Sequence, residues 1–287
     1  MKMVRHVGWP IATPYLVGLS LLIFVPAIAV SVLAFTEFNG ITDPRFTGLD
    51  NFTRLVSDDL FWLALGNSFV YALISVPLRL FGALALALLL HRKGALDGAG
   101  RVAAFVPTLV PDVTWALLWL WILNPLYGPI AALSAGFGLG SPELLTDPWS
   151  TRIALAVMGS FQLGEGFLIA LAVRRSIPTR IYEASMVDGG RPWFTLRHLT
   201  LPLMAPALAL LALRDLILTL QVNFTAALFV TNGGPHYATT YVPLFVYRVA
   251  FRYLRLGYAS TISVTMFVLT AVIVFVQYRL ARRWRLL

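Results

Sequence analysis

The sequence predicts an all-α polytopic membrane protein with six transmembrane helices, and three observations lead to that prediction. Hydrophobic residues make up 59% of the 287 residues and charged residues only 12%, about half the charged share of an average soluble domain. Six apolar runs are long enough to cross the hydrocarbon of a bilayer, which takes about 20 helical residues. Lys and Arg gather in alternate connections between these runs, as basic cytoplasmic loops do. We expect one membrane domain over residues 1–287.

The six runs place the predicted spans along the chain. They cover residues 11–35, 67–90, 102–123, 153–173, 201–224 and 257–280. The first run could instead be a signal peptide, because Lys2 precedes it and Ala27-Ile28-Ala29 resembles a cleavage site. Its length favours an uncleaved span. A further apolar run at 241–250 is too short to span.

The distribution of basic residues predicts the orientation. The segments that share a side with both termini are 1–10, 91–101, 174–200 and 279–287, and they hold 14 Lys and Arg. The other segments, 36–66, 124–152 and 225–256, hold six Lys and Arg and seven acidic residues. Since cytoplasmic loops are the more basic ones, we expect both termini and the loop 174–200 in the cytoplasm of a cell-membrane protein.

Composition also excludes several kinds of chemistry. The chain has no Cys, so it has no disulfide and no thiolate metal site. A phosphate-binding P-loop needs Lys after Gly, but the only lysines are Lys2 and Lys93 and neither follows a glycine. We therefore expect no cofactor on this chain. The net charge of +9 is explained by orientation in the membrane, so nucleic acid is not an expected partner.

The loop 174–200 is the longest polar, basic interruption between two predicted spans. Pro178 and Pro192 mark helix starts, because proline is tolerated in a first turn, where its missing N–H is not needed. We expect short helices at 181–188 and 192–198, broken at the Gly189-Gly190 pair. Composition alone favours an ordinary basic cytoplasmic loop.

The spacing within this loop carries a family resemblance. Glu183-Ala184-Ser185 is followed after three residues by Gly189, and nine residues later by Leu199-Thr200-Leu201-Pro202. This pattern resembles the EAA signature of binding-protein-dependent ABC importer permeases. Further similar segments lie outside the loop: Gly48 to Phe52, Asn67-Ser68, Thr231 to Pro235, and Gly257 to Ser260.

The resemblance runs from about residue 12 to residue 280 and is to the first permease of carbohydrate-uptake importers, a type that includes glycerol-3-phosphate permeases. The chain departs from the family pattern at several positions, including Leu199 in place of Ile and the Arg174-Arg175 pair. Ser185 replaces the second Ala of the signature, Phe161-Gln162 lacks a Trp that is frequent there, and Phe224-Thr225 stands where Phe-Asp is common. The last two lie near the expected ligand path, so they leave the substrate open.

The resemblance implies a type I ABC importer permease fold with a cytoplasmic coupling helix between helices 4 and 5. The implied ATPase-coupling residues are Glu183, Ala184, Ser185, Met186, Asp188, Gly189 and Trp193. Small side chains at 184 and 185 would let a partner approach closely, and Gly189 can take a positive φ that turns the chain. Glu183 would meet a basic ATPase residue or cap a first helical turn.

The resemblance also implies the partners. They are a second permease subunit, two ATPase subunits that hold ATP and Mg, an extracytoplasmic substrate-binding protein, the sugar and membrane lipid. The chain itself would then be no enzyme. Its substrate would be a di- or oligosaccharide, with an amino sugar or glycerol-3-phosphate as alternatives.

Ionisable residues inside predicted spans need a reason, because charges are costly in hydrocarbon. Arg79 and Asp112 have similar depth in adjacent spans, which predicts a structural ion pair. On a helical wheel, Arg214, Gln221 and Thr225 share one stripe, whereas Asn223 lies opposite. Polar residues on facing spans predict a substrate path lined by Gln162, Glu165, Arg214, Gln221 and Thr225. Alternatively, Glu165 and Arg214 only neutralise each other.

The residues alone leave two other classes of function to consider. A stand-alone secondary carrier or channel would need no coupling loop. A membrane-embedded enzyme lacks a candidate site, since the sequence shows no metal-ligand spacing and no His within a span.

Overall fold

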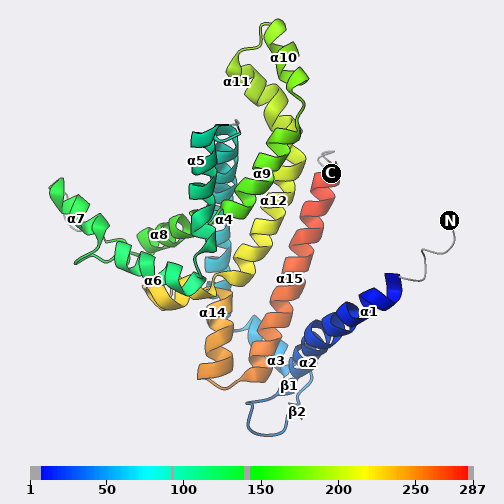
Figure 1. Ribbon diagram of the computed structural model, residues 1–287. Helices are drawn as coiled ribbons and strands as arrows, with labels where there is room; N and C mark the ends of the chain where they lie inside the picture. The colour runs from blue at the N-terminus through cyan, green and yellow to red at the C-terminus, as the bar shows by residue number, and fades with distance from the viewer. Residues whose placement is uncertain (1–7, 92–93, 139–142, 284–287) are drawn as a thin grey trace. The chain divides into compact units, whose positions relative to one another are not determined.

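The computed structural model describes residues 8–91, 94–138 and 143–283, which are predominantly helical (Figure 1). The predicted cytoplasmic ends at 1–7 and 284–287 lie outside the described residues. The α-helices are α1 (Gly8–Leu19), α2 (Val25–Leu33), α3 (Asp50–Val56), α4 (Asp59–Leu89), α5 (Ala95–Phe105), α6 (Asp112–Ile122), α7 (Pro129–Gly136), α8 (Pro148–Ser160), α9 (Gly164–Ser176), α10 (Thr179–Val187), α11 (Pro192–Thr195), α12 (Leu201–Val222), α13 (Phe224–Ala226), α14 (Val242–Tyr247) and α15 (Leu256–Arg283).

Short segments of other geometry connect some of these helices. The strands β1 (Thr36–Glu37) and β2 (Arg45–Phe46) pair antiparallel, and a 3₁₀ turn covers Val106–Leu109. Turns with π geometry cover Ser20–Phe24, Leu196–Thr200, Ala227–Thr231 and Arg248–Arg252. Because the Leu196–Thr200 turn joins α11 directly to α12, the separate helix predicted at 192–198 is wrong. The chain runs as one helix from Pro192 to Gln221.

Four helices in the described part of the chain are long and apolar enough to cross a membrane. They are Thr13–Leu33, Asp59–Leu89, Pro192–Gln221 and Leu256–Leu280. These helices contain most of the first, second, fifth and sixth predicted spans. The short run at 241–250 forms α14 and a π turn.

The third and fourth predicted spans are bent pairs of helices, and both predictions of one continuous helix are wrong. Asp97–Leu109 and Asp112–Ile122 meet at 100°, and Pro148–Ser160 and Gly164–Ser176 meet at 53°. At the first break Val110 is extended, with ψ of 126°, because the residue before a proline avoids the helical region. Counting each pair as one span gives six crossings.

By contacts between Cα atoms, the described part of the chain divides into two compact units. Unit 1 comprises residues up to Asp59 together with Phe245–Leu269, and unit 2 comprises Leu60–Leu244 together with the residues from Thr270 on. In unit 1 the main chain of residues 34–38 is held from two sides. Asn51 Nδ2 donates to the carbonyls of Ala34 and Thr36, at 3.1 and 2.9 Å. From α15, Thr261 Oγ1 also donates to the Ala34 carbonyl, at 2.8 Å.

Unit 2 has its apolar core where α4, α9 and α12 meet. The buried members are Ala83, Ala87, Phe167, Ala170, Leu171, Ile177, Met204 and Leu211. Alanines on α4 let the helices approach closely, which is how helices associate in a membrane where burial of apolar surface gives little driving force. This core fixes α9 against α12, the two helices that carry the charged residues described below.

A network of hydrogen bonds fixes the segment 231–242 in unit 2. Asn67 Nδ2 donates to the Tyr237 carbonyl at 2.7 Å, and Arg152 binds both Asn67 Oδ1, at 2.7 Å, and the Ala238 carbonyl, at 3.1 Å. Arg152 lies one turn into α8, whose start is capped by Asp147 accepting from the Ser150 N–H at 2.8 Å. That hydrogen bond lowers the pKa of the Asp147 carboxyl.

The close approach at Gly257 gives a test of unit 1. A Cβ at this position would collide with the Thr36 carbonyl oxygen, next to the 3.0 Å hydrogen bond from Gly257 N to Phe38 O. We expect Gly257→Ala to destabilise the protein by about 1–3 kcal/mol, the cost of overpacking. The measurement is the thermal unfolding midpoint of the purified protein in detergent.

The matched control is Gly66→Ala, because nothing lies within 4 Å of a Cβ added there. Alanine in the interior of α4 should stabilise it by up to about 1 kcal/mol. Equal unfolding midpoints for the two variants would contradict the close contact between α15 and the segment 34–38.

Candidate functional site

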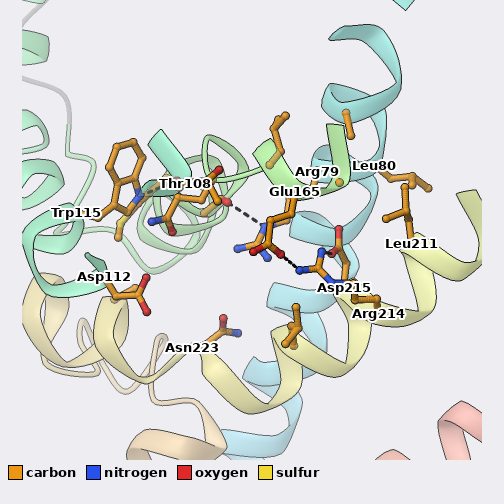
Figure 2. A pocket seen from close by; sticks show the side chains of 18 of the residues that line it. Arg79, Leu80, Thr108, Asp112, Trp115, Glu165, Leu211, Arg214, Asp215 and Asn223 are labelled. Carbon is orange, nitrogen blue, oxygen red and sulfur yellow. Dashed lines mark hydrogen bonds and ion pairs between the residues drawn. The ribbon is translucent and has the colours of Figure 1, made fainter. Parts of the chain in front are cut away.

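A polar cavity of about 410 Å³ lies in unit 2 (Figure 2). Its lining includes residues at three places where a helix ends or breaks. Thr108 and Asp112 flank the break before α6, Gly159 and Gln162 the break between α8 and α9, and Asn223 the end of α12. Its volume is within the usual range of small-molecule sites. Non-helical backbone at membrane depth is tolerated where it lines such a cavity.

The helix starts explain why acidic side chains stand at the cavity. Asp112 is the first residue of α6 and Glu165 lies in the first turn of α9, where the helix dipole favours a carboxylate. The start of α9 is anchored, because the Gly164 N–H donates to Thr108 Oγ1 at 2.9 Å. A side chain at Gly164 would collide with Thr108 and Phe105, so this tight junction requires glycine.

An ion pair joins α9 to α12 at the cavity wall. Arg214 Nη2 binds Glu165 Oε2, and Arg214 Nη1 lies 3.5 Å from Asp215 Oδ1. The Glu165 and Arg214 side chains are 57% and 37% exposed, so the pair faces the cavity rather than the core. The two interpretations left open by the sequence therefore both have support. The residues neutralise each other, and they also line the cavity.

Arg79 and Asp112 both line the cavity, but the predicted ion pair between them is wrong. The ion pairs among the described residues do not include it. Arg79 Nε donates instead to the Gly159 carbonyl, at 2.9 Å. The prediction assumed two straight antiparallel helices, whereas the 100° bend before α6 redirects the chain at Asp112.

The helical wheel for α12 placed two residues wrongly, Gln221 and Asn223. Gln162, Glu165, Arg214 and Thr225 line the cavity as predicted. Gln221 is exposed and is not among the lining residues, whereas Asn223 is one of them. Arg214, Asp215 and Leu218 line the cavity, so on the helical wheel the middle of the lining stripe falls between Arg214 and Asp215. Gln221 lies at the edge of that stripe. Asn223 follows the last helical residue, so the wheel no longer applies to it.

The loop 174–200 forms a helical hairpin at one end of unit 2, beyond the ends of α4 and α5 in Figure 1. The helix α10 ends at Val187, and Gly189 then takes a φ of +77°, as the sequence predicts. The Gly190 N–H returns to the Ser185 carbonyl at 2.7 Å, which closes the end of α10. The hairpin is thus a fixed turn between α10 and the long helix that begins at Pro192.

The predicted coupling residues have different surroundings in this hairpin. Ser185 is buried, and its hydroxyl lies 3.0 Å from that of Thr195. A Cβ at Gly190 would collide with the Ser185 side chain, so the small size of Ser185 also serves the packing of the hairpin. Ala184 and Asp188 are exposed, as is Glu183, the fifth residue of α10. That position rules out capping of the first turn by Glu183.

Four large apolar side chains at the end of the hairpin are exposed, and we call them the apolar tip. Met186, Val187 and Trp193 are 67%, 88% and 70% exposed, and Phe194 is 51% exposed. Clustered apolar side chains on a polar surface mark a contact with another molecule. Met186 and Trp193 belong to the predicted coupling set, whereas Phe194 was not predicted for it.

A second recess, in unit 1, was not predicted as a site. It has a volume of about 680 Å³ and is lined by residues of 37–54 and 253–258. Tyr258 donates to Asp58 Oδ2 at 2.6 Å, and the guanidinium of Arg54 lies 5.0 Å from the Tyr258 ring centroid. Only the acidic character of the segment 36–66 signalled this recess in the sequence.

Comparisons with known proteins agree on one family. A family described as "Binding-protein-dependent transport system inner membrane component" matches residues 79–286. The lactose transport system permease protein LacF of Rhizobium radiobacter is 29% identical over 285 residues, which cover 96% of this chain and 94% of LacF. The trehalose/maltose transport system permease protein MalF of Thermococcus litoralis is 28% identical over 280 residues, covering 96% and 93%.

A solved structure shares the fold. One chain of a bacterial alginate ABC transporter, in complex with an alginate pentasaccharide-bound periplasmic protein, superposes with a TM-score of 0.84. The superposition covers 96% of this chain and 93% of that chain, at 22% sequence identity.

The ion pair at the cavity gives a stability test. Arg214 contacts two carboxylates and Glu165 contacts one guanidinium. We therefore expect Arg214→Met to destabilise more than Glu165→Gln. Because both side chains are partly exposed, each loss should be about 1 kcal/mol or less. A loss of that size corresponds to an unfolding midpoint lower by about 2–4 °C, measured by thermal unfolding in detergent.

The double variant Glu165→Gln with Arg214→Met serves as the control. If the two side chains interact, its effect is smaller than the sum of the two single effects. Strict additivity would show that this ion pair does not stabilise the protein.

Proposed function

Because this chain belongs to the family of binding-protein-dependent transport system inner membrane components, we propose that it is one permease subunit of an ATP-driven importer for a sugar. The names of two similar proteins specify lactose and trehalose/maltose transport. The cavity suits such a ligand, since its wall combines carboxylate, amide and hydroxyl groups with the aromatic Trp115. Hydroxyl-rich ligands need both donors and acceptors.

The proposed topology has six crossings, with each bent pair counted as one. Both termini, the segment 91–101 and the hairpin of α10 and α11 then share the cytoplasmic side, because these segments hold 14 of the Lys and Arg residues. In this arrangement the segment 231–242 and the recess of unit 1 belong to the outer side. A substrate-binding protein would approach the complex from that side.

The observation that carries the proposal is the apolar tip on the hairpin. Exposed Met186, Val187 and Trp193 form no core of their own, and apolar and aromatic side chains dominate the energetics of interfaces. The occupant we propose is an ATPase subunit, because the hairpin is the part of the chain that carries the signature from Glu183 to Pro202. The exposed carboxylate of Glu183 would meet a basic group of that subunit.

Hydrolysis of ATP belongs to the partner. The chain has no sequence that could form a P-loop, and we place ATP and Mg on two ATPase subunits. A second permease subunit would complete the pathway. Closure of the ATPases on the hairpin would favour the outward-open arrangement of the permeases, as a shift between two populated states.

Substitution of Trp193 tests the docking surface. Buried Trp residues are frequent hot spots, and truncation of one costs about 2 kcal/mol or more, which is roughly a 30-fold loss of affinity. We expect Trp193→Ala to lower the amount of ATPase subunit that purifies with the permease and to lower sugar uptake into proteoliposomes. Trp62→Ala is the matched control, since Trp62 is also exposed, at 52%, but lies on α4.

A double substitution tests the signature itself. Glu183→Lys reverses the exposed charge, and Gly189→Asp places a side chain at a φ of +77°, which L-residues rarely adopt. We expect the pair of changes to abolish ATPase assembly and uptake. If both survive, the hairpin is not the docking site. If the purified chain transports alone along a gradient, without an ATPase, it is a secondary carrier and the proposal fails.

A further inference from the structure

The cavity contains a buried amide that lacks a partner. Asn223 is 8% exposed, lines the cavity, and its Nδ2 makes no hydrogen bond to the described residues. Figure 2 shows its side chain directed into the cavity. A buried donor without a hydrogen bond is costly. A ligand oxygen in the cavity would remove that cost.

Asp112 faces the same space from another helix break. It is exposed at the first turn of α6, and its carboxylate has neither an ion pair nor a side-chain hydrogen bond with the residues that the structure describes. In Figure 2 the carboxylate of Asp112 and the amide of Asn223 both point toward the middle of the cavity. Together they present an acceptor and a donor to one ligand.

The charges around the cavity do not favour an anion. Its ionisable lining residues are Arg79, Asp112, Glu165, Arg214 and Asp215. Arg214 is engaged by two carboxylates, and Arg79 donates to the Gly159 carbonyl. With all five groups ionised the net charge is −1, and protonation of one carboxyl brings it to zero. In neither state does the cavity hold an excess of positive charge.

We propose that Asp112 and Asn223 select a sugar that carries no negative charge. The carboxylate of Asp112 accepts hydrogen bonds from ligand hydroxyl or amino groups, and the amide of Asn223 donates to a ligand oxygen. A phosphate or carboxylate on the ligand would be repelled by the Asp112 carboxylate, and the charges of the lining residues do not sum to a positive charge that would offset that repulsion. This inference rests on the proposed function, since it names the substrate class of that permease.

The absence of Cys from the chain allows a direct measurement of the charge in the cavity. Thr225 lines the cavity and is half-buried, so Thr225→Cys introduces a single reporter. It is labelled in the reconstituted complex with a cationic trimethylammonium or an anionic sulfonate methanethiosulfonate. The labelling rate with each reagent is divided by the rate at which that reagent reacts with free mercaptoethanol. The parent chain, which has no Cys, gives the background labelling.

We expect the normalised cationic rate to exceed the anionic rate, because the ionised lining residues carry a net charge of −1 and a cavity of that sign attracts cations. Asp112→Asn should lower that ratio, while Asp97→Asn, on α5 and outside the cavity lining, should not change it. A ratio at or below one, or a ratio that Asp112→Asn leaves unchanged, would overturn the assignment of Asp112.

Protection by sugars tests ligand selection in the same reporter. D-glucose, D-glucosamine and D-glucuronate are compared as protectants against an uncharged methanethiosulfonate, and a sugar at its dissociation constant halves the labelling rate. We expect glucose and glucosamine to protect and glucuronate to fail. Asn223→Ala should remove protection, and Asp112→Asn should let glucuronate protect. Gln221→Ala, a change outside the cavity lining, should leave protection intact.

Protection by glucuronate equal to that by glucose in the parent reporter, or no protection by any of the three, would overturn the proposal. This readout uses neither ATP nor uptake. A failure of the inference is thus distinguishable from a failure of the importer function, which is measured by ATPase assembly and uptake.

Discussion

The ion pair between Glu165 and Arg214 is the interaction on which the site depends. It joins α9 to α12 beside the cavity, and the same two helices share an apolar core with α4. Charges at membrane depth persist only when they pair or face water, and here they do both. The same constraint explains the breaks before α6, before α9 and after α12. Each break exposes main-chain groups that hydrocarbon would not tolerate, and all three open onto one polar cavity.

The sequence predicted the helical class and most span positions because length and hydropathy act locally. The run 257–280 lies within α15, and Gly189 turns the chain as its position after α10 required. The two bends were missed for different reasons. Pro111 was a visible signal, since it forces Val110 out of the helical region. The break before Gly164 has no such local signal, because it depends on the contact of Gly164 with Phe105 and Thr108, residues distant in sequence.

The site was predicted in part for the same reason. A helical wheel identified Arg214, but it does not apply beyond Val222, where α12 ends, so it failed at Asn223 and gave no sound basis for Thr225 in α13. The pairing of Arg79 with Asp112 assumed equal depth in straight helices, and the 100° bend removes that basis. In the hairpin, residue size alone could not separate Ala184, which is exposed, from Ser185, which is buried against Gly190 and Thr195. Whether a side chain in a hairpin is buried depends on the residues that it packs against on the other side of the turn.

The continuity of α11 with α12 has a mechanical consequence. A rod of helix runs from Pro192 to Gln221 without a break, so Trp193 at one end and Arg214 near the other are separated by about 32 Å at 1.5 Å per residue. The core contacts of Met204 and Leu211 lie between them. A tilt of the helix about these contacts would move Trp193 and Arg214 in opposite directions, and Arg214, which is nearer to them, would move less. The length of this arm, more than any single contact, would set how far the cavity wall moves.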